Sequence, residues 1–388
     1  MKHWPTKTLG DVLEVSRERI EPLQHPGTSF NYVGLENVEG HTGNLLPFPS
    51  TDGAEIKSTK NVFRPGQILF GKLRPYLNKV HLAREKGICS TDIYVLNSRK
   101  ASMQPAFAAY YLRSPVVLAA VSNAMAGANL PRINESNLLG IPAPVPPLAE
   151  QGRIVKLLDE ADELRKLRAQ ADHRIARLGP ALFHAMFGEP VDNPKGYAIH
   201  QLEEMCSRIT DGTHQPPPFS DRGIPFLFVR NIVNGCIDFD TKKYITEKTF
   251  DELTRRVKPE PGDILYSTVG SYGVAVQVET DRKFAFQRHI GHLKPNQEQI
   301  DSDFLTAQLN TPCLKSQADQ SARGVAQKTV NLAEIRKFKV LVPPLILQKE
   351  FAKRVKEIRG LESQQAAGRR VLDDLFQSML HRAFSGEL

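Results

Sequence analysis

Two polar loops, each following a short apolar strand, hold the side chains of this sequence that are best suited to bind a ligand. The first loop, residues 71–79 with the sequence GKLRPYLNK, concentrates two lysines, one arginine, one tyrosine and one asparagine. Arginine forms paired hydrogen bonds with guanine, asparagine does so with adenine, and lysine neutralises phosphate groups. These residue types predict contacts with a nucleic acid; a solvated surface turn is the alternative.

The second loop, residues 267–273 with the sequence STVGSYG, is small and rich in hydroxyl groups. Its glycines would let the backbone come close to a ligand, and its serines and threonine could bond phosphates or base edges. Loop position and residue type give the candidate contact residues: Lys72, Arg74, Tyr76, Asn78, Lys79 and, as a contact to the nucleic-acid backbone, Arg132 in the first half, then Thr268, Ser271, Tyr272, Arg288 and Lys328 in the second.

Motifs that would indicate catalysis are incomplete. Residues 66–72 fit the GxxxxGK pattern, but Leu73 stands where a Ser or Thr would hold magnesium, and the middle of the motif is strand-like. The QPPPF sequence at 215–219 lacks the Asn or Asp that begins a similar loop in amino-methyltransferases. Asp263 with residues 281–283 could form a nuclease site, but its spacing is loose and the first half does not repeat it. The four scattered cysteines predict neither a zinc site nor a disulfide framework. We therefore expect recognition without catalytic or metal-binding residues.

The composition is that of a globular protein with a basic surface. The chain has 388 residues, which is long enough for two or three domains. It is 40% hydrophobic and 24% charged. Its net charge of +8 and pI near 9.2 favour a polyanionic partner. The first residues lack the apolar run of a signal peptide, and no stretch is long and apolar enough to cross a bilayer. We expect a cytoplasmic protein without a membrane partner.

The sequence repeats itself once, with an offset of 197 residues that takes Pro146 to Pro343. Each copy of PPLxxQ opens a long segment whose apolar residues are spaced by three and four, which predicts a helix with a seven-residue repeat. The resulting apolar seam includes Leu164 and Leu178 in the first copy and Leu361 and Leu375 in the second. Even the polar interruptions of the apolar seam coincide, at Arg168 and Gln365. Two helices with matching seams can bury them against each other, so we predict an antiparallel pair. The Gly-Pro pair at 179–180 should end or kink the first helix near its far end.

Nearly the same offset relates the segments that precede the helices. A Pro-Gly turn followed by a short apolar strand occurs at 65–70 and again at 261–266. The predicted fold class is α+β, with two mixed α/β domains separated by a pair of long antiparallel coiled-coil helices, in a pseudo-twofold duplication. The predicted recognition domains are residues 1–145 and 191–342, and the predicted helical segments are 146–190 and 343–388. A helix of about 30 residues is about 45 Å long, somewhat more than the roughly 34–36 Å of one duplex turn.

This arrangement resembles the specificity subunit of type I restriction–modification enzymes. Residues 65–80 are similar to the strand–loop signature of target recognition domains in that family, and 267–273 are similar to its other common loop type. Residues 146–151 and 343–348 resemble the openings of its central and distal conserved helices, although Glu150 has no counterpart at Leu347. The resemblance covers essentially the whole chain. One departure is that the chain starts almost directly with a recognition domain, which circularly arranged members tolerate.

The resemblance implies a non-catalytic subunit that selects double-stranded DNA. Each recognition domain would bind one half of a split, asymmetric target from the major groove, and the helices would set the spacer between the halves. Adenine methyltransferase subunits carrying S-adenosylmethionine would dock beside the helices, and ATP-dependent restriction and translocase subunits would join them. S-adenosylmethionine, ATP and Mg²⁺ would therefore bind the partner subunits and not this chain. The alternatives are a stand-alone or phase-variable recognition module, a fused methyltransferase–nuclease, and a coiled-coil scaffold without a DNA role.

Overall fold

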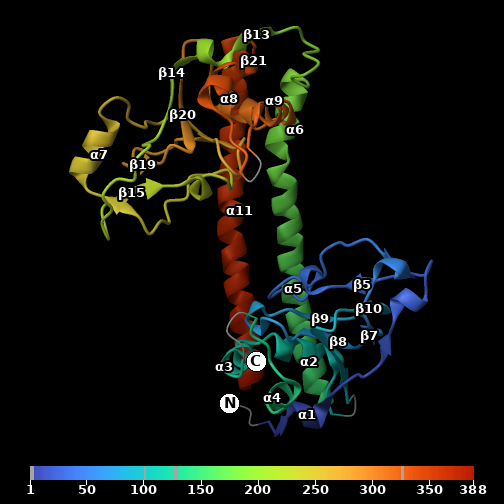
Figure 1. The fold of residues 1–388 in the computed structure, drawn as a ribbon. Coiled ribbons are helices and arrows are strands. Elements are labelled where there is room, and N and C mark those ends of the chain that lie inside the picture. Colours follow the sequence, from blue (N-terminus) through green and yellow to red (C-terminus); the bar gives the residue numbers. More distant parts are fainter. Residues whose placement is uncertain (1–3, 100–101, 126–129, 325–326) are drawn as a thin grey trace. The chain divides into compact units, whose positions relative to one another are not determined.

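The chain forms two compact units. The computed structural model describes residues 4–99, 102–125, 130–324 and 327–388. One unit contains Met1–Ala169 and Ala367–Leu388, and the other contains Gln170–Ala366. Both long helices are divided between the units, so each unit combines one globular domain with a part of each helix (Figure 1).

The globular part of the first unit is built on a four-stranded antiparallel sheet in the order β2-β11-β8-β9. A second four-stranded sheet has the order β3-β7-β10-β5, and two-stranded pairings join β1 to β12 and β4 to β6. The strands are β1 (Thr6–Thr8), β2 (Leu13–Val15), β3 (Arg19–Ile20), β4 (Ser29–Phe30), β5 (Tyr32–Val33), β6 (Thr51–Asp52), β7 (Lys60–Phe63), β8 (Ile68–Gly71), β9 (Val80–Leu82), β10 (Gly87–Cys89), β11 (Ile93–Ser98) and β12 (Pro142–Pro144). The helices are α1 (Leu9–Val12), α2 (Pro105–Leu112), α3 (Pro115–Asn123) and α4 (Glu135–Leu139), with short 3-10 turns η1 (Pro22–Gln24), η2 (Leu35–Asn37), η3 (Gly53–Glu55) and η4 (Pro75–Leu77).

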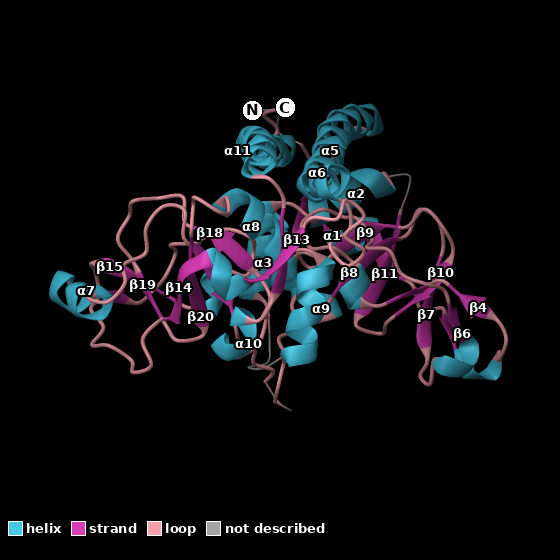
Figure 2. Cartoon of the chain, turned by 90° about the horizontal axis from the view of Figure 1, so that it is seen from above, coloured by secondary structure: helices cyan, strands magenta, loops and turns pink. Residues whose placement is uncertain are grey.

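The second unit repeats this plan. Its main sheet has the order β14-β20-β17-β18, beside a three-stranded sheet, β16-β15-β19, and the pair β13-β21. In the first unit Ile93 pairs with Gly71, and in the second Ile290 pairs with Ser267, which confirms the duplication at the level of strand register. The strands are β13 (Ala198–Gln201), β14 (Cys206–Asp211), β15 (Ile224–Leu227), β16 (Tyr244–Ile245), β17 (Ile264–Ser267), β18 (Ala275–Gln277), β19 (Ala285–Phe286), β20 (Ile290–Pro295) and β21 (Lys339–Val342). The helices are α7 (Glu247–Thr254), α8 (Ser302–Leu309), α9 (Pro312–Ser321) and α10 (Leu332–Arg336), with 3-10 turns η5 (Leu202–Met205) and η6 (Val229–Asn231). Helices and strands are mixed in both globular parts (Figure 2), as the α+β prediction requires.

The predicted long helices are α5 (Leu148–Ala176) with its continuation α6 (Leu178–Phe187), and α11 (Leu345–Ser385). The interruption at Arg177 lies just before the Gly-Pro pair, because Pro180 lacks an N–H and its ring crowds the carbonyl one turn earlier. The predicted break is thus confirmed, and α11 runs without one. No helix among the described residues is both long and apolar enough to span a bilayer.

Contacts within the first unit confirm that the helices run antiparallel there. Arg153 donates to the carbonyl of Leu388 at 2.7 Å, and Arg165 donates to Asp373 at 2.8 Å, so residue numbers rise on one helix as they fall on the other. The predicted mutual burial of the apolar seams is only partly right. Four leucines of the predicted seam remain 44–54% exposed: Leu164, Leu178, Leu361 and Leu375. A seven-residue repeat drifts around a helix of 3.6 residues per turn, so a seam this long stays on one face only where the two helices wind around each other.

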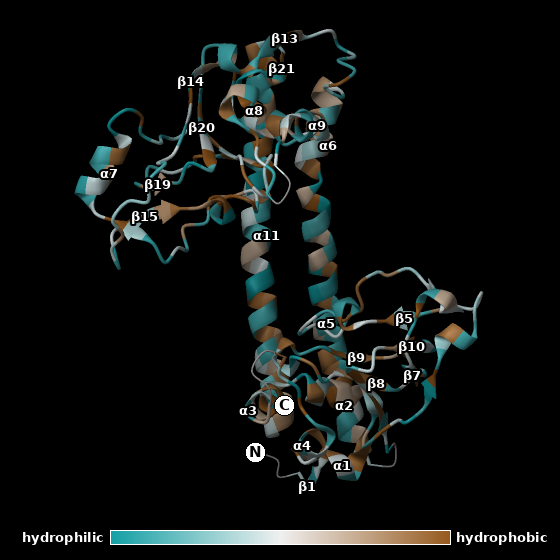
Figure 3. Ribbon diagram, viewed as in Figure 1, coloured by the Kyte–Doolittle hydropathy of each residue, from teal (hydrophilic) through white to brown (hydrophobic). Residues whose placement is uncertain are grey.

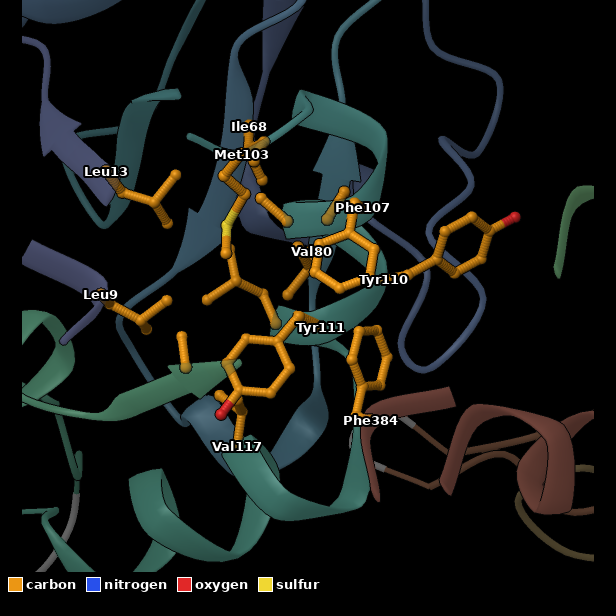
Figure 4. Packing of buried hydrophobic residues seen from close by; sticks show 14 of the residues in the cluster. Leu9, Leu13, Ile68, Val80, Met103, Phe107, Tyr110, Tyr111, Val117 and Phe384 are labelled. Carbon is orange, nitrogen blue, oxygen red and sulfur yellow. The ribbon is translucent and has the colours of Figure 1, made fainter. Parts of the chain in front are cut away.

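The most buried residues of the long helices instead pack into the hydrophobic cores of the globular parts. In the first unit, the Phe384 ring of α11 lies 5.2 Å from Phe107 and 5.0 Å from Tyr111 (Figure 4). In the second, Phe187 of α6 lies 4.8 Å from Phe304 and joins the core that the start of α11 also enters. Hydrophobic stretches therefore alternate with hydrophilic ones along both long helices (Figure 3).

The glutamine of each PPLxxQ motif fixes the start of its helix to the globular part. Gln151 is fully buried; its amide donates to the carbonyls of Pro146 and Ser102, and its oxygen accepts from the backbone N–H of Gln104. Gln348 makes the matching bonds with Pro343, Gln299 and Asp301. One side chain thus satisfies backbone groups of the proline-rich turn and of the loop before α2 or α8.

Candidate nucleic-acid interface

In the first unit, backbone hydrogen bonds gather three loops at one edge of the main sheet. The N–H of Lys72 bonds the carbonyl of Asp92 at 2.9 Å, and the N–H of Ile133 bonds the carbonyl of Lys72 at 3.1 Å. The N–H of Arg74 bonds the carbonyl of Pro131 at 2.7 Å. The predicted contacts Lys72, Arg74 and Arg132, which lie on two separate segments, are therefore brought together.

The second unit forms the same edge from the equivalent loops. The N–H of Thr268 bonds the carbonyl of His289 at 3.1 Å, and the N–H of Val330 bonds the carbonyl of Thr268 at 2.9 Å. The N–H of Gly270 bonds the carbonyl of Lys328 at 3.1 Å. This arrangement places the loop that holds Ser271 beside the segments that carry Arg288 and Lys328.

Arg74 has an unusual backbone at the exposed tip of the first edge. Its φ of 49° lies in the left-handed region, as does that of Asn78 at the other end of the 3-10 turn η4. Left-handed backbone in a residue other than glycine costs on the order of 1 kcal/mol and persists only where the surroundings enforce it. Here the bond to Pro131 and the bond from the Leu77 N–H to the Arg74 carbonyl enforce it, and the side chain is left exposed.

The remaining polar groups of the first edge interact with one another. The Lys72 ammonium lies 5.2 Å from the ring centre of Tyr94, and Arg132 pairs with Asp92 at 3.3 Å while its side chain stays 46% exposed. Tyr76 is 41% exposed. Lys72, Arg74, Tyr76 and Arg132 thus form a surface that can offer hydrogen-bond donors, positive charge and one aromatic ring.

Other predicted residues face the protein interior. Asn78 is buried and its amide donates to the carbonyl of Arg113 at 2.9 Å, while the Lys79 ammonium donates to the carbonyl of Leu35 at 2.6 Å. These two side chains hold the loop in place.

In the second unit, Thr268 and Tyr272 are buried, whereas Ser271, Arg288 and Lys328 are exposed. The Tyr272 hydroxyl donates to Asp319 at 2.8 Å, a bond that raises the pKa of this tyrosine.

An arginine-lined groove of about 720 Å³ adjoins the second edge. Arg208 of β14 lines it together with Arg255 and Arg256, which follow α7, and the lining also contains Asp211, His214 and Glu252. The groove continues the edge because the N–H of Arg288 bonds the carbonyl of Thr213 at 3.0 Å, and Thr213 lines the groove. Sequence reasoning missed these arginines. The Arg-Arg pair at 255–256 was a visible signal, but only the fold places it beside Arg208, whose guanidinium donates to the carbonyl of Arg256 at 3.0 Å.

Asp263, which the sequence suggested as part of a nuclease site, belongs to a buried network. Its carboxylate accepts hydrogen bonds from His292 at 2.7 Å, from Lys294 at 2.8 Å and from the Glu260 N–H at 2.9 Å. Burial raises the pKa of Asp263, but these bonds outweigh it and hold that pKa below its ordinary value. Within the described ranges, no group of three or more His, Cys, Asp or Glu residues is placed to hold a metal ion.

Fold and surface together define a class: a duplicated recognition protein in which two domains of one plan present equivalent loop edges with different side chains. A family model described as the type I restriction modification DNA specificity domain matches residues 1–176 and 198–366, and the chain belongs to that family.

Named relatives agree with this assignment. The chain is 31% identical over 180 residues to the type I restriction enzyme EcoDI specificity subunit of Escherichia coli, a match that covers 45% of this chain and 39% of the relative. It is 26% identical over 309 residues to the EcoBI specificity subunit of Escherichia coli, covering 72% of this chain and 65% of the relative. These matches span less than two thirds of either relative. A chain in a solved structure concerned with complex assembly and conformational transition of a type I R-M system shares the fold, with a TM-score of 0.60, 22% identity and coverage of 99% and 98%.

Proposed function

We propose that this chain is the non-catalytic DNA-recognition subunit of a type I restriction–modification complex. It binds a bipartite, asymmetric double-stranded target, with one half-site for each recognition domain. The observation that carries the proposal is the repeated edge: backbone bonds match between the units, while the residues at matched positions differ, with Gly270 in the place of Arg74 and Thr329 in the place of Arg132. Two domains that share one backbone arrangement but expose different polar side chains are suited to bind two different DNA sequences.

The polar residues of the two edges have defined tasks in this proposal. Arg74 bonds a guanine edge, and Lys72 and Arg132 neutralise phosphates of the first half-site. Ser271 contacts base edges or phosphates of the second half-site, flanked by Arg288 and Lys328. The groove arginines bind phosphates of the DNA backbone beside that half-site. The recognition domains are residues 1–145 and 191–342, joined by the helical segments 146–190 and 343–388.

The partners follow from the family. Adenine methyltransferase subunits dock beside the long helices and carry S-adenosylmethionine, and ATP-dependent restriction subunits join them with ATP and Mg²⁺. This chain supplies DNA selection and binds none of these cofactors itself. The complex acts on DNA in the cytoplasm.

Deleting the gene is expected to remove one split methylation motif from the host genome. Single-molecule sequencing of native DNA, with the gene intact and deleted, would show methyladenine in both halves of that motif only when the gene is present. Re-expression of the chain should restore the motif. If methylation is unchanged and a tagged copy brings down no methyltransferase, this proposal is wrong.

Replacing Arg208, Arg255 and Arg256 with alanine is expected to weaken binding to every DNA sequence and to reduce its salt dependence. Each lost phosphate contact lowers the slope of log K against log salt by about 0.9, so the triple variant should lose roughly two to three units of slope. A control with alanine at Lys349, Lys353 and Arg354, which are exposed on α11, removes the same charge. If the groove variant and the wild type have equal slopes of log K against log salt, the groove does not contact DNA.

A further inference from the structure

The long helices carry opposite charges at matched positions on the turns that follow their attachment to the globular parts. α5 has Asp159, Asp162 and Arg165, and 197 residues later α11 has Lys356, Arg359 and Glu362. The sign is inverted at each of the three positions. The buried apolar residues just before them keep their character, since Ile154 and Leu158 correspond to Phe351 and Val355. The duplication has therefore preserved the packing positions and reversed the charged ones.

In the first unit, the helix contributes the acidic residues at this contact, and the globular part contributes a hydrogen-bond donor and a positive charge. The Tyr110 hydroxyl donates to Asp159 at 2.6 Å. Asp162 is 7% exposed and Arg113 is 8% exposed. Burial lowers the pKa of Arg113, and Tyr110 and the carboxylate of Asp162 oppose that shift. Arg165 and Lys166 also bond Asp162, at 3.3 and 3.0 Å.

In the second unit, the helix contributes the basic residues at this contact, and the globular part contributes the carboxylates. Arg359 donates to Asp303 at 2.5 Å and to Glu279 at 2.6 Å, and the Lys356 ammonium lies 3.7 Å from Asp303. Asp303 is only 3% exposed, so its charge depends on these two partners.

The partner residues on the globular parts are not shared between the units. Asp303 corresponds to Ala106 in the first unit, and Arg113 corresponds to Asn310 in the second. If the second globular part sat on α5, Asp303 would face Asp159 and Asp162. If the first sat on α11, Arg113 would face Arg359 in the place of Asp162, and the Tyr110 hydroxyl would face Lys356 in the place of Asp159. Buried like charges without partners are strongly unfavourable, and placing them against the wrong partner is a common source of specificity.

We propose that these inverted charges make each recognition domain fit only its own helix. The part of the chain that can be exchanged between the two halves is then a recognition domain together with the first turns of the helix that follows it, and not the domain alone. This proposal does not depend on DNA binding, because it concerns how each unit packs.

The test compares two chimeras in which a second copy of residues 191–342 replaces residues 1–145. The first chimera keeps native α5. The second also carries Asp159→Lys, Asp162→Arg, Arg165→Glu and Asp373→Ala, the last because Ala176 is the residue equivalent to Asp373. The recoded chimera is expected to unfold at a midpoint at least about 5 °C higher, as a repaired buried ion pair should give in a unit of this size. Equal midpoints, or a lower midpoint for the recoded chimera, would overturn the proposal.

A control chimera keeps Asp159, Asp162 and Arg165 of α5 but carries Lys156→Glu, Glu160→Lys and Glu163→Arg, which inverts charges at exposed positions of the same helix turns. It should behave like the first chimera, and equal rescue by this control would also overturn the proposal.

A second measurement uses the native chain and remains decisive if neither chimera folds. Asp303→Arg should lower the unfolding midpoint by at least about 5 °C, and adding Arg359→Asp should recover half of that loss or more. Loss without recovery would show that the position is merely packed tightly, and no loss would show that the charges do not matter. Thermal unfolding is the readout for both experiments, so a failed DNA-recognition hypothesis would not affect their outcome.

Discussion

Phe187→Ala is expected to lower the free energy of unfolding of the second unit by about 3–5 kcal/mol, the usual cost of removing a buried phenylalanine. Phe187 is fully buried at the end of α6, and its ring centre lies 5.2 Å from Phe183, 4.8 Å from Phe304 and 5.5 Å from Phe351. Truncation would leave a cavity among three rings that are held by different elements and cannot easily close it. Chemical denaturation followed by hydrogen exchange of peptides from each unit would measure the loss.

Phe384→Ala is the matched control, because Phe384 lies 197 residues after Phe187. It packs on Phe107 and Tyr111 in the first unit and is 9% exposed, so a somewhat smaller loss is expected there. Each variant should increase exchange mainly in its own unit. A loss below about 1 kcal/mol for Phe187→Ala, far under the usual range for buried aromatic residues, would mean that α6 does not close the second core.

The duplication, the long helices and the break before Pro180 could all be predicted from the sequence, because they depend on periodic apolar residues and on proline. Which helix residues are buried could not be predicted in the same way. Leu164 and Phe384 are both apolar residues of the predicted helices, yet Leu164 is 54% exposed and Phe384 is 9% exposed. The difference arises from the globular parts, which cover the helix ends, and the local pattern carries no information about that cover.

The candidate interface shows a similar division. A loop that follows an apolar strand was enough to find Lys72 and Arg74, and the backbone bond between Arg74 and Pro131 places Arg132, which the sequence also suggested, beside them. Residue type alone also selected Asn78, whose amide is used internally. A polar side chain in a loop can serve the loop or a ligand, and only the three-dimensional contacts distinguish the two roles.

Arg74→Ala is expected to relax base choice at one position of one half-site, with a loss of discrimination of about 1–3 kcal/mol, roughly 5- to 150-fold, because a paired contact with guanine would disappear. The other half-site should keep its sequence, since the second unit has its own loop edge. The methylation motif of a host that expresses the variant, together with competition binding between DNA duplexes that differ at single positions, would measure the change.

Two further variants of Arg74 and one control elsewhere separate base contact from charge and from backbone geometry. Arg74→Lys keeps the positive charge and should still relax base choice, because an ammonium cannot form the paired bonds of a guanidinium. Arg84→Ala removes an exposed arginine elsewhere in the first unit and should leave the motif unchanged. Arg74→Gly removes the side chain but tolerates the φ of 49°, so it should match Arg74→Ala in specificity and exceed it in stability. If all variants at this position retain the original motif and affinity, Arg74 supports the loop and does not read a base.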